Sequence, residues 1–202
     1  EQCLYAVMLA SANDIALQIA EHVGGSVEGF VQMMNDRATA LGCTNTVFTN
    51  PTGLPDDNQH TTAHDMALIM QAAIQNEAFR TIATAASYTI PATNKASARN
   101  LTSKFTMTDA GSTDFYEGCI GGKEGYTEAS GSTLVCAAQR NGMTLIGVVL
   151  KGASGQTIPD AASILNYGFD QFQQLSLGND DFSIVSGGNV VLPVGSTADS
   201  LT

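Results

Sequence analysis

The sequence has few basic residues and no long apolar run, and these two deficits exclude several classes of protein. It carries 8 lysine and arginine residues against 19 acidic ones, a formal net charge of −11 over 202 residues. No basic cluster could neutralise phosphates, so we expect no nucleic-acid partner. No stretch approaches the roughly 20 successive apolar residues that span a bilayer. With 44% hydrophobic residues, the chain can still bury one sizeable core.

Motifs for disulfides and metals are also missing. The four cysteines are Cys3, Cys43, Cys119 and Cys136. They form no CxxC pair and no zinc-finger spacing; two disulfides remain possible, but small buried thiols are favoured. His60 and His64 are four residues apart, yet no metalloprotease pattern accompanies them. We therefore expect no metal site and no cofactor, with His64 at a solvated helix position.

Helical periodicity dominates the first half of the chain. It starts at once, over residues 1–9, without a methionine or a cap, and we expect the natural beginning of the chain to precede Glu1. A second apolar face runs from Val27 to Leu41, after the Gly24-Gly25 break and the potential cap Ser26. Both patterns predict amphipathic helices.

A turn-rich loop over residues 50–57 separates these helices from the next one. Thr62 and Asp65 have the spacing of a capping box, which predicts a helix start at this point. Met66 and Met70 fall on one stripe of that helix, and we expect both in the core rather than on a binding surface.

The clearest strand signal is a hairpin. Residues 132–139 and 143–150 are apolar, β-prone runs joined through Asn141-Gly142, which favours a tight turn with positive φ angles. Both runs are apolar at nearly every position, so the sheet must be covered on both faces. Helices followed by an antiparallel hairpin and a closing helix predict an α+β fold with a sandwiched antiparallel sheet.

The closing helix is predicted from Pro159, which fits a first helical turn, to an apolar stripe that includes Leu165 and Phe172. From Ser176 onward the composition becomes rich in glycine, serine and aspartate, with strand-like pieces at Phe182–Val185 and Val190–Val194. We therefore predict a first domain over residues 1–175 and the start of a β-rich domain or linker over residues 176–202.

Ser11-Ala12-Asn13 lies inside an otherwise helical run. Residues two apart on a helix point in different directions, so Ser11 and Asn13 can act on one substrate only if the helix breaks here. In the alternative interpretation, one of these two side chains merely caps the helix Asp14–Val23.

A second short motif is Gly121-Gly122-Lys123-Glu124-Gly125, just before the hairpin. A lysine on a strand, followed by a glycine that leaves the strand face clear, can place an ammonium beside a substrate that lies along the strand. The alternative is a glycine-rich turn with a solvated lysine.

In this order, the two motifs resemble those of active-site serine penicillin-recognising enzymes, and longer segments make the match closer. The sequence is similar to D-alanyl-D-alanine carboxypeptidases of the low-molecular-weight penicillin-binding type, peptidase family S11, from about Leu4 to Phe172. The matching segments include Ser11–Ala16, Ala20–Ser26, Asn50–Leu54, His60–Ala63, Tyr88–Pro91, Gly121–Lys123 and Leu165–Phe169. The resemblance implies a β-lactamase/transpeptidase-like catalytic domain over residues 1–175, incomplete at its N-terminus, with His60 as a loop anchor.

The resemblance also implies a mechanism. A serine of an SxxK motif attacks the bond between two terminal D-alanines of a peptidoglycan stem peptide, and water resolves the acyl-enzyme. Ser11, Asn13 and Lys123 would be catalytic: Ser11 relays a proton, Asn13 binds the substrate amide, and Lys123 supplies positive potential. Gly125, Tyr126 and Thr127 would bind substrate together with Glu124, and the N–H of Tyr126 would form half of the oxyanion hole. β-Lactams would acylate the same serine.

Three departures from the family pattern stand out. No serine has a lysine three positions on, so the nucleophile is expected upstream of these residues, and this chain alone is expected to be inactive. The family's K-T-G reads Lys123-Glu124-Gly125, with a carboxylate in place of a hydroxyl that contacts the substrate carboxylate. Strand alternation could instead turn Glu124 away from Lys123. The arginine that many relatives carry before the last helix is missing from residues 154–158, where Thr157 is the nearest match.

The leading hypothesis is an extracytoplasmic carboxypeptidase of the bacterial cell envelope, with membrane anchoring possible in the full-length protein. Glu124 and the missing arginine support an alternative, a weak or inactive module that binds stem peptides or a partner. A β-lactamase ranks third, because no matching general-base glutamate loop is present.

Overall fold

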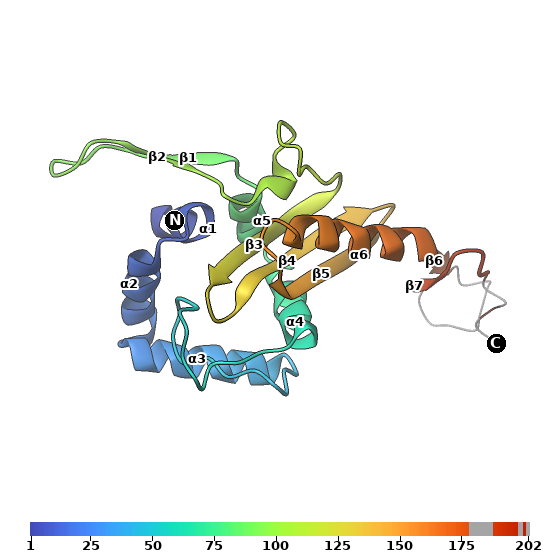
Figure 1. Ribbon diagram of the computed structural model, residues 1–202, viewed down its shortest axis with the longest axis horizontal. Coiled ribbons are helices and arrows are strands. Elements are labelled where there is room, and N and C mark those ends of the chain that lie inside the picture. Colours follow the sequence, from blue (N-terminus) through green and yellow to red (C-terminus); the bar gives the residue numbers. More distant parts are fainter. Residues whose placement is uncertain (178–187, 198–199, 201–202) are drawn as a thin grey trace.

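The computed structural model describes residues 1–177, 188–197 and 200. In chain order its helices are α1 (Gln2–Ala10), α2 (Asn13–Gly24), α3 (Val27–Ala40), α4 (Ala63–Ala73), α5 (Glu77–Ala83), the 3-10 turn η1 (Thr106–Thr108) and α6 (Thr157–Gln171). The strands are β1 (Ser87–Ile90), β2 (Arg99–Thr102), β3 (Cys119–Thr127), β4 (Gly131–Arg140), β5 (Met143–Gly152), β6 (Phe172–Leu177) and β7 (Gly188–Pro193). This is the α+β arrangement that the sequence predicted (Figure 1).

The predicted helices in the first half are confirmed. α1, α2 and α3 follow one another at one side of the molecule (Figure 1). Ser26 caps α3, because its Oγ accepts a hydrogen bond from the N–H of Gly29 at 3.0 Å. Thr62 caps α4 in the same way, accepting from the N–H of Asp65 at 3.1 Å.

The central sheet has the strand order β3-β4-β5, with both pairs antiparallel. The predicted hairpin joins β4 to β5, with Arg140 opposite Met143 across the turn. Asn141 and Gly142 have φ angles of 50° and 80°, the positive values that a two-residue hairpin turn of this type requires. The Asn-Gly signal in the sequence is therefore confirmed in detail.

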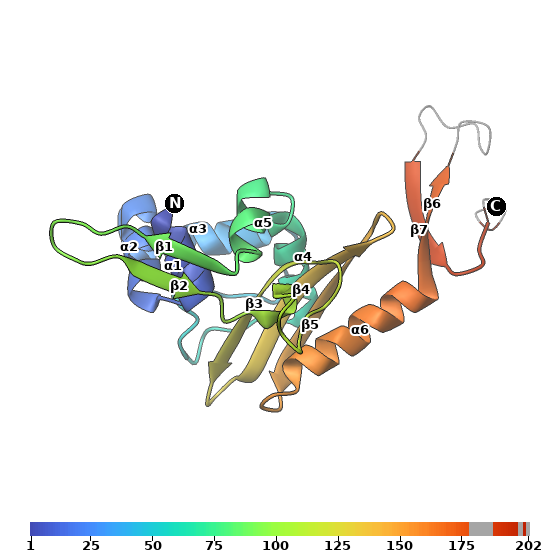
Figure 2. The same cartoon turned by 90° about the horizontal axis from the view of Figure 1, so that it is seen from above.

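Helices cover both faces of this sheet. Successive residues of β4 point to opposite faces: Cys136 packs with Leu165 of α6, whereas Ala137 packs with Met70 and Ile74 in and after α4. Figure 2 shows the sheet between α6 on one side and α4 and α5 on the other. The prediction that both faces of the apolar sheet must be covered is thus confirmed.

Two further hairpins extend from this body. β1 pairs with β2, and β6 pairs with β7 beyond the end of α6 (Figure 2). The closing helix ends before Phe172, which opens β6, so the prediction of Phe172 on the helical stripe was wrong. Strand pairing with Pro193 overrides the helical spacing there. Val190 to Pro193 lie in β7 as expected, while Phe182–Val185 fall outside the described residues, and the boundary near residue 176 stays a prediction.

The cysteines are free thiols. Cys43 and Cys136 are buried, as the sequence suggested, but Cys3 is exposed on α1, so for Cys3 the expectation of burial was wrong. Within the described part of the chain, every helix is too short or too polar to reach across a bilayer.

Candidate active site

The helical run of residues 2–24 breaks at Ser11. This residue ends α1 in the left-handed conformation, with φ 56° and ψ 45°, and α2 restarts two residues later at Asn13. A non-glycine residue rarely adopts this conformation, so the break has an energetic cost. Ala12 is the N-cap of α2, and no side chain caps it. The alternative in which Ser11 or Asn13 caps this helix is therefore wrong.

Lys123 lies on β3, and the alternative of a solvated lysine in a turn is also wrong. Its side chain is half-buried, and its Nζ donates a hydrogen bond to the backbone oxygen of Glu124 at 2.7 Å. Burial lowers the pKa of Lys123 below its ordinary value, Glu124 opposes this shift, and Lys104 adds to it. Gly122 brings β3 close to the core, because a Cβ there would lie 2.4 Å from the Cζ of Phe105.

Two adjoining cavities bring the predicted site residues together. The first cavity, of about 650 Å³, is lined by Ser11, Lys123, Glu124, Gly125 and Tyr126. The second cavity, of about 450 Å³, is lined by the same five residues and also by Asn13 and Thr127. All seven residues singled out in the sequence therefore line one continuous site, although Ser11 and Asn13 precede Lys123 by 112 and 110 residues.

The two cavities differ in character. The first also contains Lys104, Thr106, Asp114 and the start of α6, with Thr157 and Ile158. The second contains apolar side chains from α4, β4 and β5, including Met66, Leu134 and Val148. Met66 is therefore only half-buried and lines the site, so its prediction as a core residue was wrong, whereas Met70 is in the core as expected.

Glu124 lines both cavities next to Lys123. Strand alternation does not remove it from the site. Burial raises the pKa of Glu124, the Lys123 ammonium lowers it, and the Asp114 carboxylate raises it further. Among the described residues, no cation lies within salt-bridge distance of the Glu124 carboxylate. Asp114 has a partner, since its Oδ2 accepts from the Thr106 hydroxyl at 2.9 Å.

Sequence reasoning missed Lys104, Thr106 and Asp114. They lie in the irregular segment between β2 and β3, where no periodicity or motif marks them. The only available signal was the polarity of the segment after Thr102. Thr157, the nearest match to the missing arginine, lies in the first cavity and is 6% exposed.

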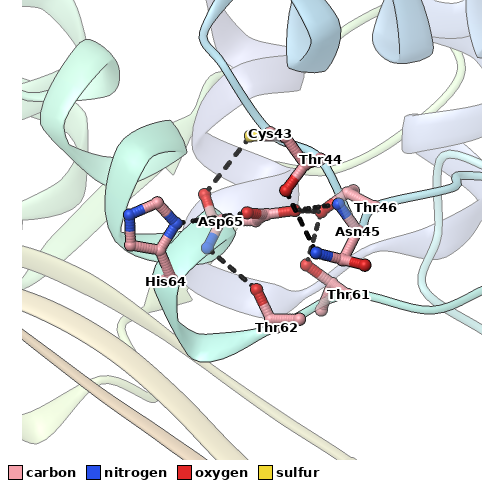
Figure 3. A network of polar contacts seen from close by, with 8 residues as sticks. All are labelled: Cys43, Thr44, Asn45, Thr46, Thr61, Thr62, His64 and Asp65. Atoms are coloured by element: carbon pink, nitrogen blue, oxygen red, sulfur yellow. Dashed lines mark hydrogen bonds and ion pairs between the residues drawn. The ribbon is translucent and has the colours of Figure 1, made fainter.

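A buried aspartate fixes the loop that borders the second cavity (Figure 3). Asp65 is 1% exposed; its Oδ2 accepts from the N–H of Asn45 at 2.8 Å and from the Thr46 hydroxyl at 2.7 Å. The Thr46 hydrogen bond holds the pKa of Asp65 below its ordinary value; burial opposes this shift, and the Asn45 N–H reinforces it. The side chain thus contacts this loop instead of completing the predicted capping box.

Next to these contacts, backbone pairing of Val47 with His60 closes the same loop, and the anchoring role of the His60 side chain stays a prediction. His64 is 76% exposed, as predicted for a solvated helix position. Asn50 orders the tip, because its Oδ1 accepts from the N–H groups of Thr52 and Gly53 at 3.1 and 2.8 Å. Among the described residues, no cluster of three or more potential ligands could hold a metal ion.

An antiparallel sheet covered by helices on both faces is also the fold of solved penicillin-binding DD-peptidases to which this chain is similar. Residues 1–154 match the family described as D-alanyl-D-alanine carboxypeptidase (Peptidase_S11), and the chain belongs to this family.

Individual relatives agree with this assignment. The carboxypeptidase DacB2 of Mycobacterium tuberculosis is 35% identical over 184 residues, covering 88% of this chain and 60% of the relative. DacF of Bacillus subtilis is 32% identical, covering 86% of this chain and 43% of the relative. A mutant of the Streptomyces K15 DD-transpeptidase superimposes with a TM-score of 0.77 at 33% identity, covering 83% of this chain and 67% of that one. The chain thus spans about half the length of these curated relatives.

Proposed function

We propose that this chain is part of the catalytic domain of a serine-type carboxypeptidase that removes the terminal D-alanine from peptidoglycan stem peptides. The nucleophilic serine and its lysine come from a segment that precedes Glu1. The observation that carries the proposal is the gathering of Ser11, Asn13 and Lys123, from three elements, around two cavities that share a wall. Family membership supports the same reaction.

Each residue has a role in this scheme. The incoming serine attacks the carbonyl carbon of the D-Ala-D-Ala bond, and the oxygen that becomes an anion is stabilised by the Tyr126 N–H and by the potential of Lys123. Ser11 passes a proton to the departing nitrogen, so that D-alanine leaves as an amine. Asn13 binds the substrate amide, while Glu124, Gly125 and Thr127 line the path of the peptide along β3. Water then hydrolyses the ester.

The proposed partners follow from this chemistry. The substrate is a stem peptide ending in D-Ala-D-Ala, and β-lactams act as inhibitors that acylate the same serine. Such a substrate lies outside the cytoplasmic membrane, so we place the protein in the bacterial cell envelope.

A fluorescent penicillin tests the proposal. The protein that includes the residues encoded before Glu1 should be labelled at one serine, which peptide mapping identifies. Lys123→Ala should reduce the labelling rate by about 10²-fold, the usual effect of losing one electrostatic contact to the transition state. Lys95→Ala is the matched control, because Lys95 is exposed between β1 and β2, away from both cavities. A folded protein without labelling would overturn the proposal.

A second candidate function is a module that binds stem peptides without turnover. The half-buried Glu124 favours it, because a carboxylate beside Lys123 reduces the positive potential that would stabilise the transition state. Stem-peptide binding without hydrolysis, together with no gain in hydrolysis in Glu124→Thr, would support this candidate. A large rise in hydrolysis in Glu124→Thr would instead indicate a weakened enzyme.

A further inference from the structure

Four charged side chains gather at the first cavity. Lys104 precedes η1, Asp114 lies between η1 and β3, and Lys123 and Glu124 are neighbours on β3. Of these four residues, only Lys123 and Glu124 also line the second cavity. The first cavity is therefore the polar half of the site, and its wall carries equal numbers of positive and negative groups.

These groups differ in what they already bind. The Asp114 carboxylate accepts the Thr106 hydroxyl, and the Lys123 ammonium donates to the backbone oxygen of Glu124. Among the described residues, the Glu124 carboxylate has neither an ion-pair partner nor a hydrogen-bond donor. A half-buried carboxylate without a partner favours a ligand that donates a hydrogen bond and disfavours one that brings a second negative charge.

The leaving residue of the substrate must lie close to this carboxylate. In the proposed reaction Ser11 gives a proton to the departing nitrogen, so the leaving residue occupies a cavity that Ser11 lines. The first cavity is the more polar of the two, and a residue with a polar C-terminal group fits it better than the second cavity. The carboxyl carbon of the leaving residue is only two bonds from the departing nitrogen.

Resting on the proposed function, we propose that Glu124 determines specificity at the leaving residue: it favours peptides that end in an amide over peptides that end in a free carboxylate. The ionised Glu124 accepts a hydrogen bond from the amide N–H and repels a terminal carboxylate at the same place. The start of α6, where Thr157 and Ile158 line the cavity, favours an anion and so opposes Glu124; the replacement of Glu124 alone isolates the contribution of its carboxylate.

The preference depends on pH. Burial and Asp114 raise the pKa of Glu124, and Lys123 lowers it; Lys104, on the same wall, adds positive charge, and Tyr126 lies at the exposed rim. Below this pKa, Glu124 is a neutral acid that can donate to a carboxylate. Hydrolysis of the carboxylate substrate should therefore rise relative to the amide as the pH falls through the pKa.

Matched substrates test the inference. The kcat/KM values of acetyl-lysyl-D-Ala-D-Ala and of its C-terminal carboxamide are compared in the protein that includes the residues before Glu1. We expect the wild type to prefer the amide at pH 7, and Glu124→Gln to lower the amide-to-acid ratio about tenfold, or about 1.4 kcal/mol. Glu128→Gln removes an exposed carboxylate from the turn after β3 and should leave the ratio unchanged.

The outcomes separate this inference from the proposed function. An unchanged ratio in both Glu124→Gln and Glu124→Thr, in protein that a fluorescent penicillin labels, would overturn this inference alone. A wild-type preference for the free carboxylate at pH 7 would do the same. Absence of labelling in folded protein overturns the proposed function and this inference together. Glu124→Thr also serves as the second variant if Glu124→Gln does not fold.

Discussion

Gly122 lies where β3 passes closest to the core, and Gly122→Ala would put a methyl group into occupied space. An alanine Cβ would lie 2.4 and 2.7 Å from two ring carbons of Phe105 and 2.7 Å from the backbone oxygen of Val135. Phe105 is buried against Met107 and Leu134, so its ring cannot turn away freely. The Val135 oxygen belongs to β4 and cannot move without the sheet.

Overpacking of this kind costs about 1–3 kcal/mol of unfolding free energy. Contacts this short with both a buried ring and a strand backbone place Gly122→Ala in the upper half of that range. For a protein of this length, each kcal/mol lowers the melting temperature by about 2–4 °C. Urea unfolding followed by circular dichroism measures the loss directly. The penicillin labelling rate should fall as well, because Lys123 follows Gly122 on the strand.

Gly188→Ala is the control, because Gly188 is also a strand glycine and a Cβ there would meet nothing within 4 Å. Its cost should be under about 0.5 kcal/mol. Phe105→Leu combined with Gly122→Ala should be more stable than the sum of the two single losses, by about 1 kcal/mol, since the smaller side chain vacates the contested space. Equal losses at Gly122 and Gly188, or strict additivity with Phe105→Leu, would refute this account of β3 packing.

Three other predictions concern the site and its surroundings. Ser11→Ala should lower the penicillin labelling rate by about 10²-fold with an unchanged urea midpoint, because only a proton relay is lost. Asp65→Asn should unfold at lower urea than wild type at pH 7. The folded pKa of Asp65 is lowered, so its stabilisation is present above the unfolded pKa of about 3.9 and is lost as pH falls through the folded value; the two urea midpoints should converge as the pH falls below that value. Cys3 should react with a thiol reagent in the native state, whereas Cys136, whose pKa burial raises to about 12, should react only after unfolding; equal rates for both would contradict the fold.

Sequence patterns correctly predicted those elements that depend only on residues close together in the chain. The Asn141-Gly142 turn, the Ser26 cap and the apolar strands of the hairpin each depend on residues adjacent in sequence, and each was predicted correctly. The capping box failed in its second half for the opposite reason. Asp65 contacts Asn45 and Thr46, about 20 residues away, and no local pattern reports that contact.

The residues of the candidate site also divide into those that a local motif predicted and those that only the fold brings to the cavity. Ser11, Asn13 and Lys123 were found through motifs whose spacing is typical of a family, and the structure brings them together. Lys104 and Asp114 were missed because they reach the cavity only through the path of the irregular chain between β2 and β3. Met66 has the helical spacing of a core residue, and only the arrangement of α4 beside the cavity reveals it as a lining residue.

Two small apolar clusters, which meet neighbouring positions of α5, set the position of Ser11 relative to Lys123. In the first cluster, Ile82 packs with Tyr5 and Leu9 of α1, and the ring of Tyr5 stacks on Tyr88 with centroids 3.9 Å apart. This cluster fixes the end of α1 and hence the left-handed turn at Ser11.

One helical turn before Ile82, Phe79 packs against the second cluster, which contains Met70 and Ile74 in and after α4; Ile120 at the start of β3 packs against the same cluster. The serine and the lysine therefore belong to one packed unit, which α5 links through its contacts with α1 and with β3. Cores of this density transmit a displacement rather than absorb it. The separation of the two side chains across the cavity is thus determined by apolar residues that do not line it, and the chemistry of the site depends on the packing of α5.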